Sequence, residues 1–139
     1  MTFSIGSIIW PADGAAAIRL YLGFLVQVLT VLKINFHGRI NDPLKLTKDY
    51  LERRLSDEER NAASAAWWSY LDSQGAIRDL QNQDALMARL AICLLSVREK
   101  DVPELGENLS WFFEVLGFLG MDLDKPIDMM CAYFKSSAR

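Results

Sequence analysis

Residues 111–119 read Trp-Phe-Phe-Glu-Val-Leu-Gly-Phe-Leu, which is more apolar surface than one helix normally buries in the core of a monomer. Drawn at about 100° per residue, the window 105–119 forms a helix with two apolar stripes. The first stripe is the expected core face and comprises Leu105, Leu109, Phe112, Phe113, Leu116 and Leu119. The second comprises Trp111, Val115 and Phe118 and is expected to point well away from the first. A surface helix needs one apolar stripe, so the second predicts contact with another helix or another protein.

The composition is that of an ordinary globular chain. With 139 residues, the chain is predicted to form a single helical domain over residues 1–139. Apolar residues make up 51% and charged residues 24%, a balance that supports a core and argues against disorder. The formal net charge of −3 argues against nucleic acid as the main partner, because a phosphate backbone attracts basic surfaces.

Cysteine use and the N-terminal sequence bear on the compartment. Cys93 and Cys131 are the two cysteines, and each lies within an apolar helical pattern, so both are expected to be reduced and buried. No basic residue precedes Arg19, so the N-terminus lacks the charged start of a secretory signal. These features predict a cytoplasmic protein.

Cap and turn residues divide the chain into about five to six helices. Asp42-Pro43 is a strong helix start, and Ser56 with Glu59 has the form of a capping box. Asp124 is expected to cap the last helix. The expected helices run from after Pro11 to about Ile34, from Pro43 to about Leu55, from Ser56 to about Gly75, over about 82–98, over 105–119, and from Asp124 onward. In the last helix we expect Ile127, Met130, Cys131 and Phe134 to face inward.

These elements predict an all-α fold. Loops of this length favour neighbouring helices that run antiparallel, so the expected architecture is an antiparallel bundle. Alternation typical of a strand is confined to Phe3–Trp10, so residues 1–10 are expected to form at most an extended N-terminal arm.

The apolar segment 15–34 has the length of a membrane span. Its polar and small residues fall along one narrow helical stripe: Arg19, Gly23, Gln27, Thr30 and Lys33. A single solvent-exposed edge is typical of a central helix in a soluble bundle. We therefore expect neither a membrane span nor a membrane partner.

No motif for catalysis or cofactor binding is present in the sequence. His37 is the one histidine, and a Cys–His pair with Cys93 or Cys131 is only formally available. Three such residues scattered over the chain do not form a zinc site, and no glycine-rich phosphate loop exists. We therefore expect no metal, no cofactor and no catalytic residue.

A pair of carboxylates is the one feature of the sequence that could support catalysis. Glu107 and Glu114 lie seven residues apart, on the same side of their helix and about 10 Å apart along its axis. Together with Asp122 they could serve a hydrolase-like enzyme, although the same spacing fits a solvated helix edge.

The segment from Asp101 to Asp128 is strongly acidic, and only Lys125 opposes its acids. Aromatic side chains interleaved with acids are the ingredients of a protein interface, because aromatics supply binding energy and charge steers a basic partner. Trp68 lies at the margin of the apolar arc centred near Trp67 and adds a second outward aromatic. The predicted partner-binding residues are Glu104, Glu107, Trp111, Glu114, Phe118, Trp68 and Asp122.

The sequence therefore favours a non-enzymatic protein-binding module with a partner that has a basic surface. Bacterial immunity proteins and antitoxins, which neutralise toxic enzymes, are small, acidic and often helical, so the class is suggested by analogy. The alternatives are a small acidic secretion chaperone or adaptor and the carboxylate enzyme. In the chaperone, Met121, Met129 and Met130 would hold a client segment. A homodimer through Trp111, Val115 and Phe118 is a further alternative.

Overall fold

The computed structural model describes residues 5–36, 40–73 and 83–137, and these residues form helices and no strand. The α-helices in this part of the chain are α1 (Gly14–Val31), α2 (Pro43–Leu51), α3 (Asp57–Ser73), α4 (Gln83–Leu95), α5 (Leu105–Phe118) and α6 (Asp124–Ser137). Two 3-10 helices, η1 (Ile5–Ser7) and η2 (Glu99–Glu104), precede α1 and α5. The predicted all-α bundle of five to six helices is confirmed.

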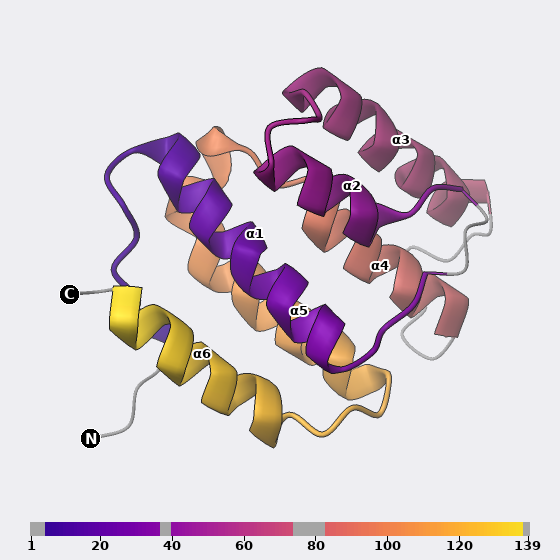
Figure 1. Cartoon of the computed structure of the whole chain (residues 1–139). Coiled ribbons are helices and arrows are strands. Elements are labelled where there is room, and N and C mark those ends of the chain that lie inside the picture. The colour runs from indigo at the N-terminus through magenta and orange to yellow at the C-terminus, as the bar shows by residue number, and fades with distance from the viewer. Residues whose placement is uncertain (1–4, 37–39, 74–82, 138–139) are drawn as a thin grey trace.

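Helix α1 lies in the middle of the bundle. Figure 1 shows it between α6 and α2 and in front of α5, and it contacts α2, α4, α6 and η2. Phe24 of α1 is fully buried, and its ring lies 5.0–6.2 Å from the rings of Phe113, Tyr133 and Phe134. On the other side of the bundle, α3 packs against α4, and α4 packs against α5.

The apolar composition of α1 fits either a membrane-spanning helix or a core helix. By length and composition this helix could cross a membrane, as many core helices could, and 44% of the tested window is buried inside the fold. The stripe of polar and small residues along α1, which was predicted to face solvent, is only partly exposed. Arg19 donates hydrogen bonds to the last carbonyl groups of α2, and Gly23 faces the hydroxyl of Tyr133, which donates to the Leu20 carbonyl at 3.0 Å. The first half of the stripe is therefore covered by α2 and α6.

The core face of α5 is confirmed, but the second stripe does not stay together. Phe112 and its neighbours on the first stripe are buried, and Leu119 is partly buried. Val115 is also fully buried, so its predicted outward position is wrong. Helix α5 packs against α4, η2 and η1, and these contacts widen its buried arc. Trp111 stays partly exposed, and Phe118 is 49% exposed.

Local signals predicted the starts of α2 and α3 and the end of α5 correctly, but α2 ends at Leu51 and not near Leu55 as predicted. The Asp42 carboxylate accepts a hydrogen bond from the Lys45 amide at 3.2 Å. The Ser56–Glu59 capping box forms, with amide-to-side-chain distances of 3.1 and 3.2 Å. Gly120 follows α5 with φ +83°, the left-handed conformation that glycine adopts without strain.

Other local predictions are wrong. Asp124 does not cap α6, because Asp122 accepts the hydrogen bond from the Asp124 amide at 2.9 Å. Ile127 is exposed. Helix α4 ends at Leu95, before the predicted end near residue 98.

Residues 5–10, the described part of the predicted N-terminal arm, are not extended away from the fold. Residues 5–7 form the η1 turn, and Ile8 is buried. The Trp10 ring packs against Tyr21 and Phe134, with centroid distances of 6.2 and 5.2 Å. The predicted positions of His37 and Gly75 lie outside the described residues.

Arg60 joins three helices from inside the protein. Its side chain is 2% exposed, and its guanidinium donates to the carbonyl oxygens of Leu94 at 3.3 Å and Val97 at 2.6 Å. The same guanidinium lies over the Tyr50 ring at 4.8 Å, and Arg19 lies 5.1 Å from that ring. Burial lowers the pKa of Arg60, while Tyr50 and the nearby carboxylates oppose the shift. Arg60 therefore caps the end of α4 from α3 and holds α2 beside both.

Replacing Arg60 with a side chain of similar length tests this cap. We expect Arg60→Met to lower the free energy of unfolding by about 2–4 kcal/mol, because buried carbonyl groups lose a charged donor. Urea denaturation measures the loss. The exposed Arg54 provides the matched control, and Arg54→Met should change stability by less than about 0.5 kcal/mol. Equal effects of the two substitutions would contradict the role of Arg60.

A matched pair of phenylalanine substitutions distinguishes the buried side of α5 from its exposed side. Phe112 is fully buried, so Phe112→Ala should cost about 3–5 kcal/mol of stability. Phe118 is half exposed, so Phe118→Ala should cost less than about 1 kcal/mol. Thermal and urea unfolding of both variants measure the difference, and a large loss from Phe118→Ala would place that ring in the core.

Candidate functional site: a pocket with two tryptophans

A pocket of about 260 Å³ lies where α3, α4, η2 and α5 meet. We call it the contact pocket. It is lined by Tyr21 of α1, Trp68 of α3, Arg89, Ile92 and Cys93 of α4, Ser96 and Val97 that follow α4, Asp101 and Glu104 of η2, and Asn108 and Trp111 of α5. Trp68, Glu104 and Trp111, three of the predicted partner-binding residues, are thus brought together from segments distant in sequence.

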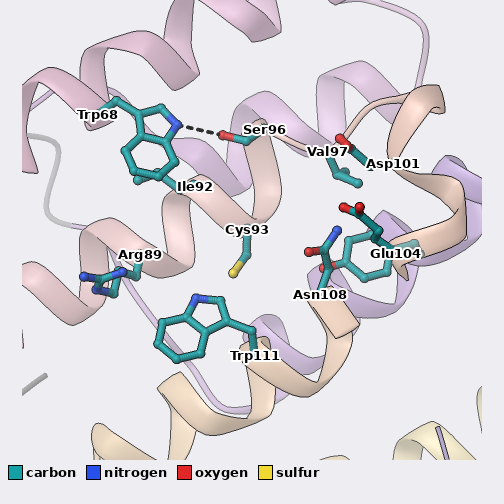
Figure 2. Close-up of a pocket in the computed structure, with 11 residues that line it drawn as sticks. Trp68, Arg89, Ile92, Cys93, Ser96, Val97, Asp101, Glu104, Asn108 and Trp111 are labelled. Atoms are coloured by element: carbon teal, nitrogen blue, oxygen red, sulfur yellow. Dashed lines mark hydrogen bonds between the residues drawn. The ribbon is translucent and has the colours of Figure 1, made fainter. Parts of the chain in front are cut away.

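Trp68 is held by a hydrogen bond at its indole N–H, while much of its ring is exposed to solvent. Its indole N–H donates to the Ser96 hydroxyl at 3.3 Å (Figure 2). The Ser96 hydroxyl also forms a hydrogen bond with that of Ser64. Ser64 is buried, yet Trp68 remains 43% exposed. The indole is therefore held in one orientation while much of its apolar surface faces solvent.

Trp111 forms the opposite wall together with Arg89. The Arg89 guanidinium carbon lies 5.6 Å from the centroid of the Trp111 ring, within the range of a cation–π contact. The Arg89 Nε atom is buried and has no hydrogen-bond partner in the described part of the chain. Leaving a buried donor unpaired costs about 1–3 kcal/mol.

Carboxylates lie on the far side of the pocket. Figure 2 shows Asp101, Glu104 and Asn108 across from Arg89 and Trp111, with Cys93 between the two groups. Asp101 accepts a hydrogen bond from the Arg98 amide at 2.9 Å, which fixes the start of η2. Glu104 is exposed, so its carboxylate can meet a cation from outside.

The remaining predicted contact residues of α5 form a line along its exposed side, which we call the α5 stripe. Glu107, Trp111, Glu114 and Phe118 are spaced by four, three and four residues, so they share one side of the helix over about 16 Å. Glu107, Glu114 and Phe118 are exposed. Trp111 belongs to both the α5 stripe and the contact pocket, so the two form one continuous surface.

Asp122 lies outside this surface. It follows α5, is exposed, and its carboxylate caps the start of α6. Its placement supports a structural role, and the predicted contact role is not needed to explain it.

The carboxylate enzyme finds no support at this pocket. Glu107, Glu114 and Asp122 are exposed and do not line it, and the carboxylates that do are Asp101 and Glu104. Among the described residues, no group of three or more His, Cys, Asp or Glu side chains is placed to hold a metal ion.

The other two alternatives also lose geometric support. Met130 is buried, and Met121 and Met129 are partly buried against the core, so these side chains do not form an open groove for a client. The homodimer hypothesis requires Val115 at the surface, but Val115 is fully buried.

Sequence reasoning missed Arg89, Ser96 and Asn108. Arg89 had a readable signal, because it is a charged residue within the otherwise apolar helix between Leu86 and Leu95. Ser96 and Asn108 had none, since their roles depend on which helices meet.

Comparison with protein-family models, with curated proteins and with solved structures finds no match to this chain. The function of the contact pocket and the α5 stripe is therefore argued from their geometry and chemistry.

Cys93 supplies a test of how closed the pocket is. Burial raises the pKa of its thiol to about 12, and Arg89 opposes this shift. As the pH rises, the thiol of the unfolded chain ionises first, so the unfolded state loses a proton that the folded state keeps. We expect this thiol to lower the free energy of unfolding by about 1–2 kcal/mol between about pH 8 and pH 10.

The measurement compares urea denaturation of the natural chain and the Cys93→Ala variant over this pH range. The variant should lose less stability as the pH rises. Parallel curves for the two proteins would show that the thiol ionises in the folded state as it does in the unfolded state.

Proposed function

We propose that this chain is a non-enzymatic protein-binding module of the immunity or antitoxin type, which binds a toxic enzyme and neutralises it. The contact surface is the contact pocket together with the α5 stripe. The observation that carries the proposal is that two incompletely buried tryptophans, Trp68 and Trp111, meet at one pocket at the end of a line of acidic residues.

The aromatic groups of this surface suit an interface. Tryptophan and arginine are enriched among residues that dominate binding energy, and such residues cluster around well-defined pockets. Trp68, Trp111 and Arg89 have this composition and arrangement. A side chain of the partner that enters the contact pocket would cover both indoles.

The charges of this surface suit a basic partner. Glu104, Glu107 and Glu114 are exposed, and no ion pair to them is formed within the described residues. Exposed, unpaired charges act over distance and accelerate association with a surface of opposite charge. Neutralisation requires only that the bound chain cover the partner's active site, which needs no chemistry on this side of the interface.

The pocket is also rigid enough to bind without large rearrangement. Arg60 holds the carbonyl groups on either side of Ser96, and Ser96 in turn holds the Trp68 indole. A surface ordered before binding loses less conformational entropy when the partner arrives.

Charge reversal on the α5 stripe tests the proposal. The tagged chain is expressed in cells of its source, and the retained protein is identified and assayed for catalytic activity with and without the chain. We expect a folded enzyme whose activity falls on binding. Glu107→Lys with Glu114→Lys should weaken its binding by at least roughly tenfold, because attraction becomes repulsion.

The matched control is Glu52→Lys with Asp72→Lys, which changes the net charge equally at exposed positions just after α2 and on α3. This control should bind the enzyme as the natural chain does. Equal loss in both double variants would contradict the assignment of the surface. Retention of an extended, unfolded client would replace the proposal with the secretion chaperone.

A further inference from the structure

The contact pocket has two chemically different ends. Arg89 and Trp111 lie on one side, and Asp101, Glu104 and Asn108 lie on the other (Figure 2). A pocket that only received an apolar side chain would need neither charge. Opposite charges across one cavity instead match a ligand that is itself charged at both ends.

The Arg89 end fits a carboxylate. The buried Nε donor has no partner in the described part of the chain, and the guanidinium carbon lies 5.6 Å from the centroid of the Trp111 ring. A guanidinium is planar and presents its donors in a fork that pairs with two oxygen atoms, so it binds carboxylates more specifically than a lysine does.

The opposite end fits a cation. The Glu104 carboxylate is exposed and forms no ion pair with any described residue, and Asp101 adds a second carboxylate at the same end. The Asn108 amide lies beside them and offers an oxygen acceptor. An ammonium or guanidinium group here would meet acceptors and negative charge together.

The middle of the pocket is apolar and small. Cys93 lies in the middle with Ile92 and Val97 beside it (Figure 2), and the Tyr21 ring, which is 1% exposed, closes the pocket from the core. Its volume of about 260 Å³ is below the range of about 300–1,000 Å³ typical for drug-sized ligands. The space therefore suits one amino acid with an aliphatic chain.

We propose that the contact pocket binds a basic α-amino acid with a free carboxylate. The carboxylate pairs with Arg89, the aliphatic chain lies between Ile92 and Val97, and the terminal cation lies at Asp101 and Glu104. This binding is a property of the isolated chain and does not depend on the proposed partner.

A titration with L-arginine, followed by NMR of the indole N–H groups, tests the proposal on the purified chain. The signals of Trp68 and Trp111 should shift saturably. Trp67 is the internal control, because its indole donates to Asn41 at 2.8 Å and does not line the pocket. Absence of a saturable shift up to about 10 mM ligand, which is weaker than typical specific binding, would overturn the proposal.

Two analogues separate the ends of the ligand. Agmatine lacks the carboxylate of arginine, and citrulline replaces its cation with a neutral urea group. Each should bind at least roughly tenfold more weakly than arginine, because each loses one charge-assisted contact. Agmatine binding as tightly as arginine would overturn the proposal, since the carboxylate would then not be recognised.

Matched variants assign the contacts. Arg89→Gln should weaken the binding of arginine and should not weaken that of agmatine, which has no carboxylate for Arg89 to bind. Glu104→Gln should weaken arginine and leave citrulline unchanged. Arg54→Gln and Glu107→Gln are the controls, since both residues are exposed and lie outside the pocket. Equal effects of Glu104→Gln and Glu107→Gln would contradict the assigned position of the cation.

Arginine with a free carboxylate could come as the free amino acid or as the end of a peptide chain. The tripeptide Gly-Gly-Arg and its C-terminal amide distinguish these sources. Tighter binding of the free-acid tripeptide than of arginine identifies a chain end, and tighter binding of arginine identifies the free amino acid. If the tripeptide binds at least as tightly as arginine, equal binding of its C-terminal amide would overturn the proposal, because the carboxylate would then not be recognised. Failure of this test leaves the proposed function standing, because charge reversal on the α5 stripe measures it separately.

Discussion

The buried guanidinium of Arg60 determines how the elements around the contact pocket are arranged. It replaces solvent as the donor for the carbonyl groups of Leu94 and Val97, and it packs on the Tyr50 ring that also receives Arg19. Removing a charge from water is costly unless it is well paired, so the position of this side chain constrains three helices at once. The pocket depends on that constraint because Ser96 lies between the two capped carbonyl groups.

The excess apolar surface of α5 is divided between the core and the surface. Val115 is taken into the core by the contacts of α5 with α4 and η2, whereas Trp111 and Phe118 remain accessible. Trp111 then meets Trp68, which is exposed for an independent reason, namely that its N–H is held by Ser96 at the rim of the pocket. Trp68 and Trp111, large aromatic residues of a kind that is usually buried, are thus both accessible at the contact pocket.

The sequence predicted the parts of the fold that depend on neighbouring residues. The helix starts at Asp42 and Ser56 and the stop at Gly120 follow from local hydrogen bonds and backbone conformation, and all three are present. The end of α4 could not be predicted, because Arg60 supplies its cap from another helix. For the site, periodicity identified the outward aromatics and acids, but not which helices would meet, so Arg89 became a site residue only in three dimensions.

The central claim is that the α5 side of the bundle is where this chain meets another molecule. Site-specific photo-crosslinking in cells of the source tests it most directly, with a photoreactive amino acid at position 107 on the α5 stripe or at position 52 just after α2. Both positions are exposed, so neither replacement disturbs the core. We predict a discrete crosslinked product from position 107 and none from position 52. A product from position 52 alone, or none from either position, would contradict the account.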